Sequence, residues 1–426
     1  MLKREIKRWD LVLLIINSII GAGIFGLPSK IFSLAGVYSI AAIFICAILM
    51  LVIILNFSEV ASQFKKTGGP YLYTLKAFGK FPGYIIGWLA LISRIAAYAA
   101  LINLLVDYLS YLNERFNDQS VRSITIIIIT AIIFLVNYRG VKSSSRLNNL
   151  LGISKLIPLT LFVIVGFFFI DFALLDFNQP SLSITDFSSA ILILVFAFTG
   201  FEAAVINTGE MSNPEKDIPF ALIFSTLFVA LFYILIQVVS VGTFPDLANS
   251  NKPIADAADF IFGSTGGLLI TIGAVISIGG TLNANLLAGS RLPFALSEEN
   301  QFPMVFSKTN TKTAIPYVSL IVYSVVTILV SVTGTFIYAL SISVISKVFV
   351  FAVISAALIK LRTANKQNET AFKLRFGYLS SILGIIICVW LLSVSNLSDF
   401  KDVVLIIIAG LIVYFIFKFT VKMRNK

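Results

Sequence analysis

Histidine is absent from this chain of 426 residues, and cysteine occurs only twice. Without histidine, the protein has no histidine metal site, no His-based catalytic triad and no imidazole proton relay. Both cysteines, Cys46 and Cys388, fall within apolar runs, so no disulfide framework is expected. The sequence also offers no metal-ligand cluster, cofactor motif or nucleophile paired with a base. An enzyme is therefore not predicted, and any proton chemistry must use Lys, Glu, Asp or Tyr side chains.

Charge is scarce as well, at 12% of residues against about 25% in soluble globular proteins. Hydrophobic residues make up 58% of the chain, and apolar runs of about 18 residues or more, each able to cross a hydrocarbon core of about 30 Å as a helix, recur along its whole length. We therefore predict an all-α integral membrane protein of about twelve transmembrane helices. The runs lie at residues 9–34, 36–60, 81–111, 121–138, 147–171, 187–209, 217–243, 265–296, 316–334, 337–360, 377–396 and 402–420.

The basic residues are gathered on alternate connections between the runs. With a cytoplasmic amino terminus, the outer segments hold few of them, namely Arg115, Arg122, Lys252 and Lys401. This bias follows the positive-inside rule, so we expect both termini in the cytoplasm and the protein in the plasma (inner) membrane. The net charge of +11 is then topological, and no nucleic-acid partner is predicted. The inner segments hold Lys65, Lys66, Lys76, Lys80, Arg139, Lys142, Arg146, Lys308, Lys312, Arg362, Lys366, Lys373, Arg375, Lys418, Lys422, Arg424 and Lys426.

Two of the apolar runs carry glycines where a transmembrane helix should be most regular. The first run contains Gly21-Ala22-Gly23-Ile24-Phe25-Gly26, and the sixth contains Phe196-Ala197-Phe198-Thr199-Gly200-Phe201-Glu202. Broken helices at bilayer depth are tolerated only where the freed backbone is buried in protein or lines a water-filled cavity, and they mark substrate and ion sites in secondary transporters. We therefore predict that spans one and six are discontinuous and that the breaks are functional.

The two breaks lie five spans apart, which predicts an internal repeat. Because five is odd, a second block repeating the first would enter the membrane in the opposite direction, as in many secondary transporters. We predict a single transmembrane domain, 1–426, built from a first repeat in 1–175 and an inverted second repeat in 185–362. Spans eleven and twelve, in 375–426 with a cytoplasmic tail, lack intramembrane charge and are expected to be peripheral. The repeat is inferred from break placement and span count.

Several motifs of spans one to eight resemble those of the amino acid–polyamine–organocation (APC) permeases, in family order. The resemblance implies a LeuT-type fold of twelve helices and amino acid transport; spans nine to twelve are similar by hydropathy alone. The motifs are Gly21-Ala22-Gly23-Ile24-Phe25, Gly68-Gly69-Pro70-Tyr71, Lys155-Leu156-Ile157-Pro158-Leu159, Gly200-Phe201-Glu202, Asn213-Pro214-Glu215 with Ile218-Pro219, and Thr281-Leu282-Asn283-Ala284-Asn285 with Arg291.

The first break predicts a site for the carboxylate of an amino acid. Unwinding at Gly21 to Gly23 exposes N–H groups at the start of the outer half-helix, where the dipole is positive and Ile24 follows. The family usually has serine where Ala22 stands, so one hydroxyl contact is missing and recognition relies on the backbone. The competing interpretation is a glycine-rich crossing that lets helices pack closely.

The second break predicts the complementary site for the α-ammonium group. Carbonyl groups of Phe196, Ala197 and Thr199, next to Gly200, can accept its hydrogen bonds, so that the two breaks together bind a zwitterion. Phe196 is also a candidate thin gate over the substrate, although a packing role is nearly as good an explanation. Glu202 is either a proton-sensitive gate or a carboxylate that satisfies the unwound backbone.

Lys155, in span five, is the candidate for coupling transport to protons. An ammonium group within a span costs about 2.5–3.5 kcal/mol on insertion scales, so a lysine there is expected to have a function. The resemblance implies that it occupies the space of a sodium ion and faces a hydroxyl of span eight, Thr281 first and Ser277 second. The alternative is a permanently charged structural tether. Both interpretations argue against sodium coupling.

Two further cations, Arg94 in span three and Lys347 in span ten, are also predicted within the membrane, in spans that line the family's cavity. A guanidinium near the substrate side chain could pair bidentately with a carboxylate, which favours an acidic substrate. The competing interpretation is an internal ion pair of Arg94 with Glu202 or Asp107. Cationic substrates are disfavoured in either case.

The sequence thus predicts a secondary active amino acid transporter that works by alternating access, is sodium-independent and couples to protons, with an acidic or neutral amino acid as substrate. An exchanger of the same fold is the alternative. A channel is less favoured because the polar residues cluster at two breaks and form no continuous pore. No cofactor or metal is predicted; the expected partners are the amino acid, protons and the lipid bilayer. The sequence indicates neither the particular amino acid nor the oligomeric state.

Overall fold

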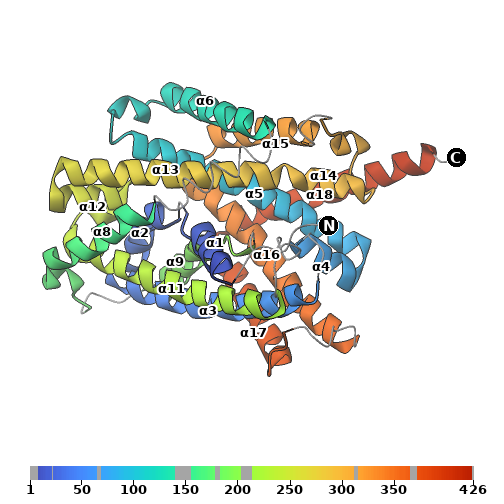
Figure 1. Cartoon of the computed structure of the whole chain (residues 1–426), viewed down its shortest axis with the longest axis horizontal. Coiled ribbons are helices and arrows are strands. Elements are labelled where there is room, and N and C mark those ends of the chain that lie inside the picture. Colours follow the sequence, from blue (N-terminus) through green and yellow to red (C-terminus); the bar gives the residue numbers. More distant parts are fainter. Residues whose placement is uncertain are drawn as a thin grey trace. The chain divides into compact units, whose positions relative to one another are not determined.

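The computed structural model (Figure 1) describes residues 8–21, 23–64, 69–139, 155–177, 183–202, 214–310, 315–364 and 372–424. Within these ranges the secondary structure is helical and contains no strand. Seven helical segments of the described residues are long and apolar enough to cross a membrane, and shorter apolar helices accompany them. The predicted all-α membrane fold is confirmed.

Each of the apolar runs found in the sequence contains helix. The first run is divided between α1 (Arg8–Ile19) and α2 (Gly23–Ala35), whereas each later run has one main helix. These are α3 (Ser39–Ser62), α5 (Lys80–Leu109), α6 (Gln119–Tyr138), α8 (Leu156–Gly166), α9 (Ile184–Phe198), α11 (Pro214–Thr243), α13 (Ser264–Gly289), α15 (Tyr317–Thr333), α16 (Phe336–Thr363), α17 (Gly377–Ser393) and α18 (Leu397–Arg424).

Short helices connect several of the long ones, namely α4 (Gly69–Phe78), α12 (Pro253–Phe262) and α14 (Arg291–Glu298). Local sequence explains where helices begin. Ser183 precedes α9, and its hydroxyl accepts a hydrogen bond from the Asp186 N–H at 3.3 Å, as expected of a serine N-cap. Proline opens α12 at its first turn, where its missing N–H removes no helical bond.

The chain divides into two compact units. The first comprises Met1–Ile86, Asp171–Ala248 and Lys347–Ser395, and the second comprises Gly87–Ile170, Asn249–Ser346 and Asn396–Lys426. Each unit takes segments from both predicted repeats, so the repeats 1–175 and 185–362 are not the compact units. The inverted symmetry itself stays a prediction.

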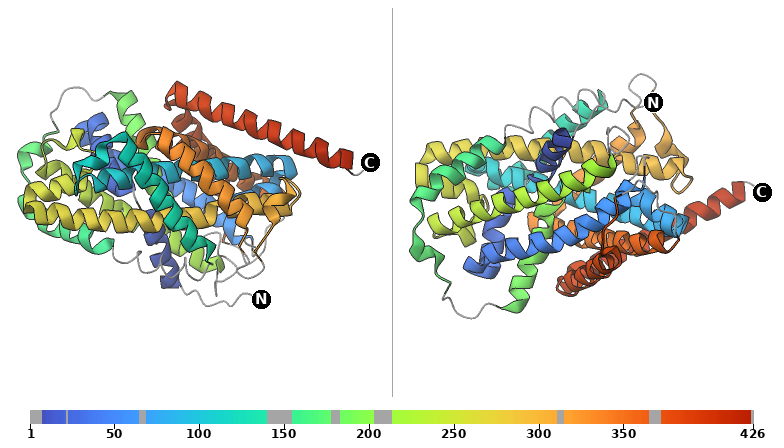
Figure 2. Two further views of the ribbon diagram at one scale, coloured as in Figure 1. Left: turned by 90° about the horizontal axis from the view of Figure 1, so that it is seen from above. Right: turned by 60° about the horizontal axis from the view of Figure 1, so that its bottom comes forward.

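In the first unit, α3 is the central helix. It packs against α9, α11 and α17, and Figure 2 shows α3 and α11 running side by side. A buried aromatic cluster fills the interior, where the Phe57 ring of α3 meets Phe201 at 5.2 Å and Phe351 of α16 at 5.5 Å, both edge to face. The α1 helix packs on α11, and α2 packs on α9. The two broken spans therefore share one unit.

A buried ion pair ties α3 to α16 in the same unit. Glu59 is fully buried, and its two carboxylate oxygens accept bonds from the Arg362 Nε at 2.7 Å and Nη2 at 2.6 Å. The backbone N–H of Leu374 donates to the same carboxylate at 2.9 Å. One helical turn away, Asn56 bonds with Ser355 of α16 and Ser380 of α17. Buried polar groups thus attach α16 and α17 to α3.

The second unit pairs α6 with α15 and α12 with α13. Reciprocal hydrogen bonds join α5 to α16, since the Ser93 hydroxyl donates to the Ser343 carbonyl at 3.2 Å and the Ser343 hydroxyl returns to the Ser93 carbonyl at 2.9 Å. The α18 helix joins this unit at Trp88, whose indole N–H donates to the Ile406 carbonyl at 2.9 Å.

We predict that Arg362→Met destabilises the protein strongly. The substitution leaves the buried Glu59 carboxylate without its guanidinium, which costs about 3–5 kcal/mol for ion pairs of this kind. Thermal unfolding in detergent, followed by tryptophan fluorescence, measures the loss. The matched control is Arg8→Met, which breaks the pair with Asp217; Arg8 is 46% exposed there, so about 1 kcal/mol or less is expected. Equal losses of melting temperature in the two variants would contradict the prediction.

Candidate functional site

Both predicted helix breaks are present. In span one, α1 ends at Ile19 and α2 begins at Gly23, so Ile20 and Gly21 are not helical; Ala22 lies outside the described residues. In span six, α9 ends at Phe198, and Thr199 adopts an extended conformation with ψ of 160°. Gly200 follows with φ of 119°, a value that residues with side chains rarely adopt. Each break thus occupies the glycine positions that the sequence singled out.

The two breaks contact each other through their glycines. A Cβ atom at Gly23 would lie 2.8 Å from the Ala197 Cα, which is closer than real Cβ contacts. A Cβ atom at Gly200 would run into the carbonyl group of Ser18, near the end of α1. Glycine at these positions therefore lets the backbones of the two spans cross directly, inside the first unit.

Tyr233 of α11 joins the two broken spans at this crossing. Its hydroxyl is buried and lies 3.1 Å from the Ile19 carbonyl oxygen and 3.2 Å from the Ala197 carbonyl oxygen. One hydroxyl proton serves these two acceptors, which belong to the last turns of α1 and α9. Helix C-termini leave carbonyl groups without intrahelical partners, so the hydroxyl satisfies backbone that the breaks set free. Sequence reasoning missed Tyr233; the available signal was a tyrosine within an apolar run, since a buried tyrosine hydroxyl needs a partner.

Several of the backbone groups assigned to the substrate already have partners within the chain. The Gly21 N–H donates to the Ile19 carbonyl at 2.7 Å. The Phe196 carbonyl accepts from both the N–H and the hydroxyl of Thr199, at 3.2 and 2.8 Å. The N–H groups in the first turn of α2, from Gly23 and Ile24 onward, have no intrahelical acceptor by position. The structure thus leaves the start of α2 as the better-placed anion site of the first break.

Glu202 lies directly beyond the second break. Its half-buried carboxylate accepts a hydrogen bond from the Gly200 N–H at 2.7 Å. This contact stabilises the unusual conformation of Gly200, because the backbone donor that the break releases is paired with a side-chain oxygen. A proton-sensitive role for Glu202 stays a prediction.

Three of the candidate coupling residues, Lys155, Ser277 and Thr281, belong to the second unit. Lys155 is 3% exposed and directly precedes α8. The Thr281 hydroxyl of α13 donates to the Ser277 carbonyl at 3.0 Å, while the buried Ser277 hydroxyl has no hydrogen-bond partner among the described residues. Lys347, which is half-buried on α16, belongs to the first unit, as does Glu202.

The α8 and α13 helices run antiparallel, and two contacts between them show which part of α13 lies beside Lys155. Pro158 meets Gly273, where a Cβ atom would lie 2.5 Å from the Pro158 Cγ, and Phe169 beyond α8 meets Phe262 before α13 at 5.9 Å. Lys155 lies three residues before Pro158, or about 4.5 Å along the chain direction. Ser277 lies four residues after Gly273, or about 6 Å along α13. Because the helices are antiparallel, both displacements point the same way, so Lys155 and Ser277 lie at a similar height.

The alternative pair of Arg94 with Asp107 is wrong. Both residues lie on the continuous helix α5, thirteen residues and therefore about 20 Å apart. Asp107 instead pairs with Arg122 of α6 at 2.6 Å. Half-buried Arg94 interacts electrostatically with Tyr323 of α15, whose hydroxyl donates to the Asn285 side chain at 2.7 Å. Whether Arg94 contacts the substrate stays a prediction.

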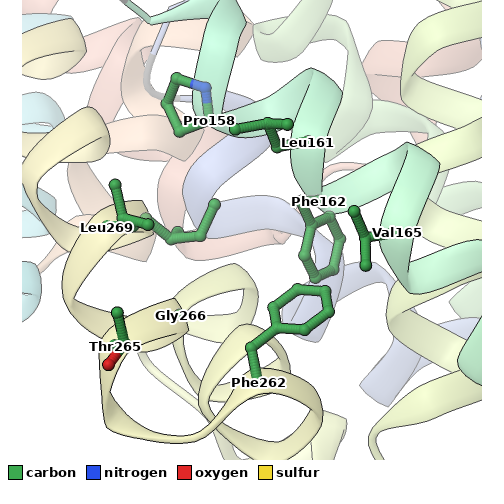
Figure 3. A pocket seen from close by; sticks show the side chains of 9 residues that line it. Pro158, Leu161, Phe162, Val165, Phe262, Thr265, Gly266 and Leu269 are labelled. Carbon is green, nitrogen blue, oxygen red and sulfur yellow. The ribbon is translucent and has the colours of Figure 1, made fainter.

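A pocket of about 230 Å³ lies between α8, α12 and α13 in the second unit (Figure 3). Its walls are apolar side chains such as Leu161, Phe162, Phe262 and Leu269. Burying a zwitterion among groups that make no hydrogen bonds is strongly unfavourable. This pocket is therefore not an amino acid site, and the crossing of the two breaks remains the candidate.

A comparison with known proteins identifies the family to which this chain belongs. The family model described as Amino acid permease matches residues 6–417. The chain belongs to the amino acid permease family. The resemblance of its motifs to APC permeases is confirmed, and the permease is an integral membrane protein that transports amino acids and not an enzyme.

Three curated relatives come from Bacillus subtilis (strain 168). The permease is 33% identical to the serine/threonine exchanger SteT over 71% of this chain and 70% of the relative. It is 26% identical to the methylthioribose transporter, over 100% of this chain and 95% of the relative. It is also 26% identical to the branched-chain amino acid permease BcaP, over 98% of this chain and 93% of the relative.

We predict that Gly200→Ala abolishes most transport by the permease. A side chain at φ of 119° costs about 1–3 kcal/mol in strain, and its Cβ atom also collides with the Ser18 carbonyl. Uptake of a mixture of radiolabelled amino acids into proteoliposomes measures the loss, which we expect to be about tenfold or more.

The matched control is Gly36→Ala. Gly36 also has a positive φ, of 53°, but a Cβ atom there meets nothing within 4 Å. This control therefore carries strain without the collision, and we expect it to retain transport. Equal transport by both variants would contradict the claim that contact between the breaks matters.

Proposed function

We propose that this permease is a secondary active transporter that binds the backbone of its amino acid where the two broken spans cross. One observation carries the proposal: the N-terminus of α2 and the C-termini of α1 and α9 meet inside one unit. Helix ends carry partial charges of about +0.5 and −0.5, so the crossing offers both signs at once. An amino acid zwitterion presents a carboxylate and an ammonium group in the same arrangement, and alternating access would expose this site to each side in turn.

We further propose that transport is sodium-independent and coupled to protons through Lys155. The antiparallel register of α8 and α13 brings Lys155 level with Ser277, which makes Ser277 a better candidate partner than Thr281. The buried Ser277 hydroxyl has no hydrogen-bond partner among the described residues, so it can accept from an ammonium group. A lysine held among such groups can bind or release a proton as its surroundings change.

An exchanger is the second candidate, and the kinship with a protein named as a serine/threonine exchanger favours it. The names of two relatives also favour a neutral amino acid as substrate. The half-buried guanidinium of Arg94 favours an acidic one instead. One relative is named as a methylthioribose transporter, so the transport assays should also include methylthioribose.

We predict that Lys155→Ala removes the response of uptake to a proton gradient. In proteoliposomes, wild-type uptake should rise when the outside is more acidic, and replacing sodium with choline should change nothing. Lys155→Arg distinguishes coupling from a charged tether, because arginine keeps the charge but does not titrate in proteins. A coupling lysine predicts substrate binding without gradient response in this variant, whereas a tether predicts a normal response.

Lys360→Ala is the control, since Lys360 is an exposed lysine near the end of α16. It should behave as wild type. A normal gradient response in Lys155→Ala would disprove the coupling role. Uptake that requires amino acid inside the liposomes, and ignores the gradient, would establish the exchanger instead.

A further inference from the structure

The pocket between α8, α12 and α13 has no place in the proposed transport mechanism. Figure 3 shows Leu161 and Phe162 of α8 facing Leu269 of α13, with the ring of Phe262 closing one end. Among the lining residues, Thr265 alone carries a polar side-chain atom. A solute that needs hydrogen bonds would lose them on entry, at a cost of several kcal/mol.

Small residues on α13 create the hollow. A Cβ atom at Gly266 would come within 2.6 Å of the Phe262 Cβ, so glycine is needed for α12 to fold back against α13. The contact of Pro158 with Gly273 brings α8 against α13 at the other end of the pocket. The pocket is therefore built into the packing of three helices.

The mouth of the pocket continues onto an exposed apolar surface of the same helices. Leu161 is 50% exposed and Leu269 is 55% exposed, and they are flanked by Ile164 at 56% and Ile272 at 48%. In an integral membrane protein, exposed apolar side chains on spanning helices face the hydrocarbon of the bilayer. Whatever enters this pocket therefore enters from the hydrocarbon.

We propose that this pocket binds one acyl chain of a membrane phospholipid. A helix from a second copy is too wide, since a helix with its side chains measures about 10–12 Å across. The volume of about 230 Å³ is below that of pockets for whole drug-sized molecules, about 300–1,000 Å³, but it suits part of a single chain. The bound chain packs against Pro158, one turn from Lys155, and supports α8 in its position on α13.

Quenching of tryptophan fluorescence by brominated acyl chains tests the proposal. Leu269→Trp places the probe in the pocket wall, whereas Leu268→Trp places it on the neighbouring residue of α13, which is also exposed to hydrocarbon but outside the lining. The full chain is reconstituted in phosphatidylglycerol bilayers with increasing fractions of brominated phosphatidylglycerol. A binding site predicts steeper quenching of Leu269→Trp at low brominated fractions.

Filling the pocket should abolish this excess quenching. Thr265→Phe fills it from α13 and Val165→Phe fills it from α8, so one variant remains if the other fails to fold. Each is combined with Leu269→Trp. Equal quenching of Leu269→Trp and Leu268→Trp would show general contact with lipid and overturn the proposal. If Leu269→Trp becomes better protected from quenching as the protein-to-lipid ratio rises, a second copy of the chain occupies the pocket. That result would also overturn the proposal.

Discussion

Direct contact between the backbones of two interrupted helices is the constraint on which the rest of this structure depends. Breaking a transmembrane helix frees N–H and carbonyl groups, each of which costs several kcal/mol if it meets only hydrocarbon. The permease pairs these freed backbone groups within the crossing itself. Gly23 and Gly200 allow the spans to touch, Glu202 accepts the freed Gly200 N–H, and the Tyr233 hydroxyl serves the carbonyl groups of Ile19 and Ala197. The same pairing leaves opposite partial charges close together, which is what a zwitterion requires.

The hydrogen bonds of α11 make the broken spans part of one body. Along α1, Arg8 pairs with Asp217 at 2.8 Å, the Ser225 hydroxyl donates to the Val12 carbonyl at 3.1 Å, and Tyr233 reaches the Ile19 carbonyl. These bonds fix α1 to α11 from its first turn to its last. Movement of α1 without α11 would break all of them, so the two helices are expected to move together.

The sequence predicted the positions of both breaks because glycine has few uses in a transmembrane helix other than close approach or an unusual φ. It could not reveal Tyr233 or the Glu59–Arg362 pair, whose residues lie 303 positions apart, because such partners depend on how helices pack. The pair of Arg94 with Asp107 was a different kind of error. A rise of about 1.5 Å per residue already separates them by about 20 Å on one helix, so the sequence alone could have rejected it. The roles of Arg94, Lys155 and Lys347 stay predictions, since they depend on contacts with a substrate.

The central claim is that the crossing of the two breaks recognises both charges of an amino acid. Thermal unfolding of the purified permease tests it most directly, because a ligand that binds the folded state raises the melting temperature. The amino acid that stabilises most is compared with its decarboxylated amine and its deaminated acid, at equal concentration. The account predicts stabilisation by the amino acid and none by either analogue. Equal stabilisation by the amine or by the acid would contradict it.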